Sequence, residues 1–226
     1  MRPTELLGAR HGFDQRAAET RKAIESAGGR AVDLIADFAD PTDVRRLIAE
    51  TREATASGTV DVLVNNAGGG GFAPTEDTSE DMFDTAFAVN VKAPYLLTAA
   101  FAPAMAERGR GAIVNVGSLS TTMAASGTSA FQAAKAALSM LTKSWTAEYG
   151  PRGVRVNSID PGYVLTRVNE HIRDMFSGYL ATLPTGRGAQ PGEVAEAIRF
   201  LVSPQASYIQ GATLSVDGGK NAVVTM

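Results

Sequence analysis

The residues of this chain best placed to do chemistry are a serine, a phenylalanine and a lysine. Phe131 and Lys135 are related as i and i+4, so on a helix they share one face. Ser118 precedes that segment and directly follows the apolar run 112–117. A hydroxyl, an aromatic ring and an ammonium group can therefore converge at one place. Because a phenyl ring has no exchangeable proton, the pattern predicts a catalytic helix whose proton donor is missing.

The elements that must position these residues alternate along the chain. Short apolar runs with β-type composition are separated by longer helical patterns, and most of the runs are nearly continuous in apolar residues, as expected for parallel strands covered on both faces. The expected strands are 5–9, 31–35, 60–64, 112–116, 154–159 and 213–216, and the expected helices are 14–26, 41–56, 79–106, 128–149 and 191–201. This alternation predicts one doubly wound α/β domain over residues 1–226, with ligands bound beyond the C-terminal ends of the strands.

Composition and charge narrow the class of protein. The chain has 226 residues, of which 44% are hydrophobic and 20% charged, and this suits one globular domain with a sizeable core. The net charge is −3, and no run of Lys and Arg is dense enough for nucleic acid binding. Cysteine is absent, and the two histidines, His11 and His171, lie far apart without other ligand residues nearby. We therefore expect neither disulfides nor a metal site.

Targeting and membrane signals are not expected either. Residues 1–14 lack the apolar core of a signal peptide. The longest weakly charged stretch, 85–106, is interrupted by polar residues and prolines, which favours a buried interface helix over a membrane span. The expectation is a cytoplasmic protein without membrane contact.

Seven short segments stand in a fixed order along the chain. They are AD at 36–37, DVLVNNAG at 61–68, NV at 90–91, IVNVGS at 113–118, FQAAK at 131–135, RVNSIDPG at 155–162 and VDGG at 216–219. Any one of them is a weak signal. Together, from Ala31 onward, they resemble the short-chain dehydrogenase/reductase family, of the kind that includes the β-ketoacyl-carrier-protein reductases. The resemblance implies a Rossmann-like sheet and hydride transfer between NADP(H), or alternatively NAD(H), and a small carbonyl or alcohol substrate.

The resemblance also implies cofactor-binding roles for matched residues. Asp37 would bond the adenine, and Lys135 would hold the nicotinamide ribose. A floor under the cofactor and contacts to the nicotinamide carboxamide would come from residues at the ends of two strands. These residues are Asn66, Ala67, Gly68, Pro161, Gly162, Val164 and Thr166.

For catalysis, the resemblance implies that Ser118 bonds the substrate oxygen and that Asn90 holds a proton-relay water. At the position of Phe131 the family carries a tyrosine that protonates the substrate oxygen, helped by the lysine ammonium. A well-placed general acid contributes about 10²–10⁴ in rate, so the chain as written should have weak or no activity. Tyr163 is the tyrosine best placed to approach the pocket, but it belongs to another segment, and we do not expect it to substitute.

The beginning of the chain departs from the family as well. Residues 16–31 read like the family's second helix running into its third strand, so 5–9 corresponds to the second strand and one N-terminal βα unit is lacking. Arg10 would then stand where NADP-preferring members carry a cation for the 2′-phosphate. The alternative is a degenerate phosphate loop at 8–13 with 5–9 as the central strand, in which Asp14 would repel a pyrophosphate.

Three interpretations of function stay open. The first is an NADP(H)-dependent carbonyl reductase, the second is a non-catalytic relative that acts as a binding or assembly subunit, and the third is an inactive variant or truncated gene model of an active reductase. Residues 162–190 are irregular and suit a substrate lid. The broad apolar faces of 79–106 and 128–149, together with the resemblance, predict a homodimer or homotetramer.

Overall fold

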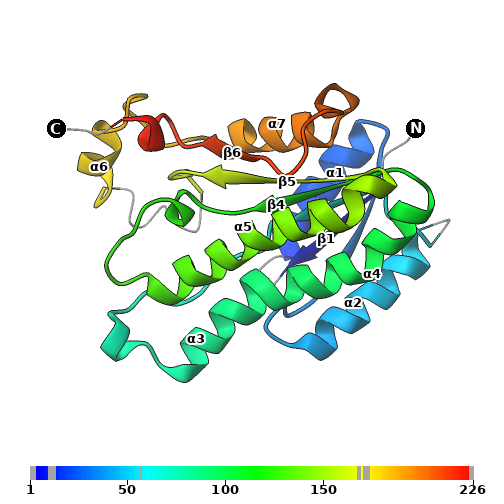
Figure 1. Cartoon of the computed structure of the whole chain (residues 1–226), viewed down its shortest axis with the longest axis horizontal. Coiled ribbons are helices and arrows are strands. Elements are labelled where there is room, and N and C mark those ends of the chain that lie inside the picture. The colour runs from blue at the N-terminus through cyan, green and yellow to red at the C-terminus, as the bar shows by residue number, and fades with distance from the viewer. Residues whose placement is uncertain (1–3, 10–13, 56–57, 167–168, 170–173, 224–226) are drawn as a thin grey trace.

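The computed structural model of the chain describes residues 4–9, 14–55, 58–166, 169 and 174–223 (Figure 1). Every strand expected from the sequence is present, with ends that differ by no more than two residues. The strands are β1 (Thr4–Ala9), β2 (Arg30–Ile35), β3 (Val62–Asn65), β4 (Gly111–Val116), β5 (Val154–Pro161) and β6 (Thr213–Val216). β3 begins two residues later than expected, and the carbonyl oxygen of Val60 accepts from the Arg108 guanidinium (2.7 Å).

The helices cover these strands on both faces. They are α1 (Asp14–Ser26), α2 (Pro41–Ala54), α3 (Glu80–Phe87), α4 (Ala93–Glu107), α5 (Ser129–Tyr149), α6 (Ser177–Ala181) and α7 (Pro191–Val202). Figure 1 shows α7 above β4, β5 and β6 and the helices α4 and α5 below them. The larger core cluster lies on the α4–α5 side, and the smaller one lies between the sheet and α7. The α/β fold expected from the alternation of elements is therefore confirmed.

The expectation of a single helix over 79–106 is wrong in one respect. A π turn over Ala88–Lys92 separates α3 from α4. Asn90 lies in this turn, and its side-chain Nδ2 donates to the carbonyl oxygens of Ala86 (2.7 Å) and Gly69 (2.5 Å). Single π turns of this kind are frequent at functional sites. A second difference is α6, which lies within the stretch 162–190 that was expected to be irregular.

The expected single sheet is divided into two. β3, β4, β5 and β6 form a four-stranded parallel sheet, whereas β1 and β2 form a separate parallel pair. Within the described residues β1 pairs with β2 and not with β3. Most of the loop expected at 8–13 lies outside the described residues.

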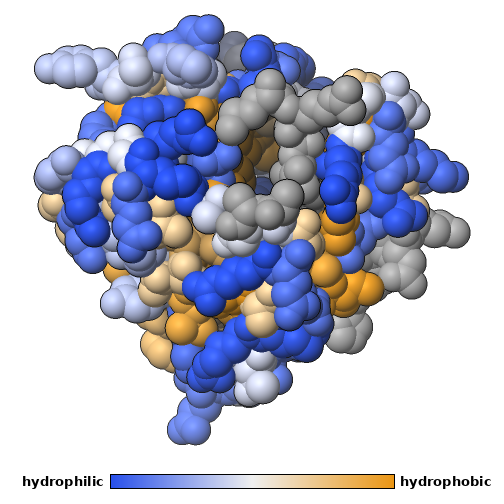
Figure 2. Space-filling model, turned by 90° about the vertical axis from the view of Figure 1, so that its right-hand side faces the viewer, coloured by the Kyte–Doolittle hydropathy of each residue, from blue (hydrophilic) through white to orange (hydrophobic). Residues whose placement is uncertain are grey.

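The division leaves the outer edge of β3 open. Val64 is 37% exposed, although its register partner in β4, Val114, is fully buried. Ile35 at the end of β2 is also exposed. Figure 2, which faces the right-hand end of Figure 1, shows that apolar surface reaches solvent in a hollow at that end of the molecule. Among the described helices, none has the length and apolar character that a membrane span requires.

One helix joins the two sheets. α2 packs against both β2 and α4, and its buried residues Leu47 and Ile48 belong to the same core cluster as Phe101 and Met105 of α4. The Arg52 guanidinium adds a hydrogen bond from α2 to the carbonyl oxygen of Ala100 in α4 (3.0 Å). The β1–β2 pair is therefore attached to the rest of the domain through helix packing and not through a strand ladder.

Candidate active site

Lys135 is carried by α5 to the C-terminal end of β4. Its side chain is only 3% exposed, and its Nζ donates to the carbonyl oxygen of Val116 at 2.7 Å. Burial lowers the pKa of Lys135 to about 8, and the nearby Asp160 carboxyl opposes that shift. Lys135 is therefore a held ammonium at neutral pH, and only one of its three N–H donors is used within the described residues.

Ser118 stands at the turn that follows β4, two residues beyond Val116. Its Oγ accepts from the backbone N–H of Ser120 (3.1 Å), and it caps the short helical turn Leu119–Thr121. The hydroxyl accepts in this contact, so its own proton remains available to a ligand oxygen. Ser118 thus caps a turn and can still act as a donor.

Asn90 and Gly68 meet Lys135 at one point. Asn90 is fully buried. A Cβ atom placed on Gly68 would lie 3.0 Å from Lys135 Nζ and 3.2 Å from Asn90 Oδ1. The amide, the ammonium and the glycine backbone therefore share one small space, where a larger residue at position 68 would press on both side chains. This close approach gives a physical reason for a glycine there.

Phe131 has a phenyl ring, which cannot donate a proton, at the position where the resemblance implies a tyrosine. Its ring packs edge-to-face on Phe72, with centroids 5.6 Å apart, and Lys135 Nζ lies 5.8 Å from its centroid. Tyr163 does not replace it, because the Tyr163 ring packs against Phe176 at 4.9 Å. The Tyr163 hydroxyl is buried without a partner among the described residues. The described part of the site contains a hydroxyl and an ammonium but no phenol beside them.

The residues expected at the adenine end lie on the separate sheet. Asp37 follows β2, and its Oδ1 accepts from the N–H of Ala39 (2.9 Å), which is the local turn role that aspartate often takes. Asn66 and Ala67 follow β3, where the N–H of Asn66 bonds the carbonyl oxygen of Val64 (3.1 Å). Arg10 lies outside the described residues.

The segment after β5 is held close to the end of β6. Pro161 ends β5, and the N–H of Gly162 bonds the carbonyl oxygen of Val216 (3.0 Å). A Cβ on Gly162 would lie only 2.8 Å from the Cα of Asp217, so a side chain cannot be accommodated there. Val164 forms a bridge with Ala189. This bridge joins the two ends of the segment expected to be the lid.

Beyond that bridge, Asn169 fixes the backbone on either side of Leu165. Its Oδ1 accepts from the N–H of Thr166 (2.8 Å), and its Nδ2 donates to the carbonyl oxygen of Val164 (2.7 Å).

Asp160 is a buried carboxyl that the sequence reasoning left without a role. It lies near the end of β5, is 1% exposed, and its Oδ2 accepts from the Thr121 hydroxyl at 2.5 Å. Burial raises the pKa of Asp160, whereas the Thr121 hydroxyl, the Ser118 N–H and the Lys135 ammonium lower it. β5 also carries Arg155, Asn157 and Ser158, so its sequence does not single out Asp160, and the partners of Asp160 are far away along the chain.

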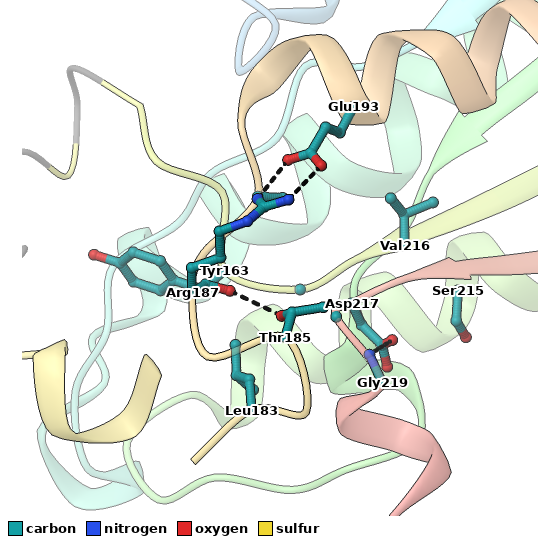
Figure 3. A pocket seen from close by; sticks show the side chains of 12 residues that line it. Tyr163, Leu183, Thr185, Arg187, Glu193, Ser215, Val216, Asp217 and Gly219 are labelled. Carbon is teal, nitrogen blue, oxygen red and sulfur yellow. Dashed lines mark hydrogen bonds and ion pairs between the residues drawn. The ribbon is translucent and has the colours of Figure 1, made fainter. Parts of the chain in front are cut away.

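Two cavities lie near the site without containing Ser118, Phe131 or Lys135. One, of about 220 Å³, lies beyond the ends of β5 and β6. Figure 3 shows its wall, where Arg187 forms a two-bond ion pair with Glu193 and the Tyr163 ring points away from that pair. The other, of about 320 Å³, lies between the starts of α3 and α5. Among the described residues no group of three or more potential ligands could hold a metal ion.

Known proteins are similar to this chain in sequence. A family profile described as enoyl-(acyl carrier protein) reductase matches residues 8–221. Galactitol 2-dehydrogenase (L-tagatose-forming) of Cereibacter sphaeroides is 39% identical over 212 residues, which cover 92% of this chain and 83% of that protein. A Xanthobacter autotrophicus protein named inactive 2-(S)-hydroxypropyl-CoM dehydrogenase 2 is 35% identical over 218 residues, covering 93% of this chain and 94% of that protein.

A solved structure is similar over nearly the whole chain. The gluconate 5-dehydrogenase from Burkholderia cenocepacia, solved in complex with NADP and tartrate, superposes with a TM-score of 0.86 at 32% identity and covers 97% of this chain and 86% of that one. Both the fold and the sequence thus point to one group of proteins. The chain belongs to the short-chain dehydrogenase/reductase family.

Proposed function

We propose that this chain is an oxidoreductase that binds NADP(H), with NAD(H) as the alternative, beside an alcohol or carbonyl substrate. Its hydride transfer is weak or absent as the chain stands because Phe131 occupies the position of the proton donor. The observation that supports this proposal is the convergence of Lys135, Asn90 and Gly68 at the end of β4, next to Ser118.

The residues present suit the nicotinamide end of such a cofactor. Lys135 has two unused N–H donors in a buried place, which fits the ribose hydroxyls. Gly68 leaves room for the Lys135 ammonium and the Asn90 amide to lie side by side at the end of β3. The adenine end is less well provided for, since Asp37 is engaged in a turn.

When bound, the nicotinamide would accept or supply the hydride. The Ser118 hydroxyl would donate to the substrate oxygen and orient it, and the Lys135 ammonium would hold the ribose and make the local potential positive. Asn90, fixed by two donor bonds, would orient a water molecule through its Oδ1. Without a phenol at position 131, the proton for the substrate oxygen would have to come from solvent.

A second candidate function is binding without catalysis. Phe131 removes the acid without disturbing the Lys135–Val116 bond or the Asn90 turn, so a ligand site can persist after the chemistry is lost. The relative named inactive, which this chain covers over 94% of its length, supports this reading. A third possibility is an altered or truncated form of an active reductase.

The remaining features of the proposal concern substrate and assembly. Residues 162–190 would form the lid that selects a small alcohol or carbonyl compound. Exposed apolar side chains on α3, α4 and α5, namely Phe83, Tyr95 and Met140, would form the contact of a homodimer or homotetramer. We place the protein in the cytoplasm, with which the absence of cysteine from its sequence is compatible.

The test is a titration of the native chain with NADPH, followed by nicotinamide fluorescence, with Lys135→Met as the control variant. We expect binding that the variant weakens at least about tenfold, because a charged hydrogen bond to the ribose is lost. Failure of the native chain to bind millimolar NADPH would exclude the reductase proposal for this chain.

Turnover separates the first two candidates. Phe131→Tyr should raise the rate of alcohol oxidation by about 10²–10⁴, since it restores a general acid at the expected position. Measurable turnover that Phe131→Tyr leaves unchanged would show that the missing phenol is not what limits the site.

A further inference from the structure

Two buried side chains of opposite charge contact residues 116–121, the segment that leads from the end of β4 through the Ser118 turn. From α5, Lys135 bonds the carbonyl oxygen of Val116. From β5, the Asp160 carboxyl packs against Gly117 so closely that a Cβ there would overlap Oδ1, and Oδ2 accepts from Thr121 at the far end of the turn. Residues 116–121 are therefore held on one side by a cation and on the other by a carboxyl group.

The two groups also depend on each other electrostatically. Lys135 is buried, with only 3% of its surface exposed. No carboxylate of the described chain lies within ion-pair distance of its Nζ. The Phe131 ring on α5 lies 5.8 Å from Nζ, and Asp160 on β5, which packs against Gly117 next to the Val116 that Lys135 bonds, is the acidic group that raises the Lys135 pKa. A buried ammonium without a counter-charge would favour its neutral form and lose its value as a ribose donor.

Asp160 is itself unusual in its surroundings. Its Oδ2 accepts from Thr121, whereas its Oδ1 is buried and makes no hydrogen bond of good geometry among the described residues, although the nearby Ser118 N–H and Ser158 hydroxyl lower the pKa of the carboxyl. Burying a carboxyl with one oxygen unpaired is costly, so the residue is poorly explained by fold stability alone. An asparagine or threonine could accept from Thr121 without introducing a buried charge.

We propose that Asp160 is a positioning residue of this site, the carboxylate that fixes the Ser118 turn through Thr121 and supplies the counter-charge of the buried Lys135 ammonium. It would act through Ser118 and Lys135 and not by touching the substrate. The inference rests on the proposed function for its purpose, but its two structural claims are measurable without a cofactor or a substrate.

The two claims can be separated by two variants. Asp160→Asn keeps the size of the side chain and an oxygen that can accept from Thr121, but it removes the charge. Thr121→Val keeps the charge and removes the hydrogen bond to the turn. Asp61→Asn, an exposed carboxylate paired with Arg108, is the matched control for loss of one negative charge.

The charge claim is tested by titrating the native chain with ¹³Cε-labelled lysine by NMR, the Lys135 signal being assigned by its loss in Lys135→Met. We expect the Lys135 pKa, about 8 in the native chain, to fall to about 7 or lower in Asp160→Asn and to stay unchanged in Thr121→Val and Asp61→Asn. An unchanged Lys135 pKa in Asp160→Asn would overturn the counter-charge role.

The turn claim is tested by amide hydrogen exchange at Ser120, whose N–H bonds the Ser118 Oγ. Thr121→Val should raise this exchange rate at least about tenfold, whereas Asp160→Asn should change it much less. Equal exchange in the native chain and in Thr121→Val would refute the positioning of Ser118. If NADPH binds to none of these proteins, the proposed function fails, while both of these measurements still decide the role of Asp160.

Discussion

β4 and β2 are both six-residue parallel strands, yet they are in very different surroundings. β4 pairs with β3 on one side and β5 on the other, and five of its six residues are buried. β2 pairs only with β1, and one of its six residues is buried. The two sequences, GAIVNV and RAVDLI, are similar in apolar content, so the difference arises from the neighbours that each strand has and not from its own propensity.

This difference coincides with the division of the candidate site. Ser118, Asn90, Lys135 and Asp160 belong to the four-stranded sheet and to the helices packed on it. Asp37 belongs to the two-stranded sheet, which reaches the rest of the domain through α2. The part proposed to do chemistry is therefore built on a well-covered scaffold, and the part proposed to hold the adenine is built on a sparsely covered one. We expect the two halves of the cofactor site to differ in local stability.

The largest expected effect is in native-state hydrogen exchange. Amides of β4 and β5 should exchange at least about 1,000-fold more slowly than those of β2, because opening β2 breaks one ladder and exposes little apolar surface. Exchange measured residue by residue by NMR in the native chain gives both rates together. Comparable protection of β2 and β4 would mean that the open side of the small sheet is covered in solution, and the comparison would fail.

The next effect uses the buried cation of the larger sheet. Lys135 has a pKa of about 8 in the folded chain and about 10.5 when unfolded, so between these values the unfolded state binds more protons. The free energy of unfolding should therefore rise with pH from about 8 to 10.5, by up to about 3 kcal/mol from this group. Urea unfolding of the native chain and of Lys135→Met across this range isolates the contribution, since the variant should lack it. A rise of equal size in both proteins would assign it to other groups.

The sequence was sufficient for the order and type of the strands and for the main chemical residues. Nearly continuous apolar runs predict buried parallel strands, and all of the expected strands are present. The i and i+4 spacing placed Phe131 and Lys135 on one face of α5. From that face the Phe131 ring contacts Phe72, and Lys135 Nζ donates to the carbonyl oxygen of Val116.

Other features depend on contacts that no local pattern records. The Asn90 amide in the π turn bonds the carbonyl oxygen of Gly69, which belongs to a loop 21 positions earlier in the chain. The role of Asp160 depends on Thr121, 39 positions earlier in the chain. The open edge of β3 is likewise a matter of strand pairing, because the run VLVN reads the same whether one or two strands flank it.

The smallest effect tests that open edge with a matched pair of residues. Val64 and Val114 are register partners on adjacent strands. In the described sheet, β3, which carries Val64, has a neighbouring strand on one side, whereas β4, which carries Val114, has one on both sides. Val114→Thr should lower the free energy of unfolding by about 1–3 kcal/mol, because a hydroxyl is buried without a partner. Val64→Thr should change it by no more than about 0.5 kcal/mol, because the site is partly in water. Urea unfolding of both variants under one condition gives the two changes in the free energy of unfolding for direct comparison. If Val64→Thr cost as much as Val114→Thr, the outer edge of β3 would have to be covered in solution by another strand, and the division of the sheet would not describe the protein in solution.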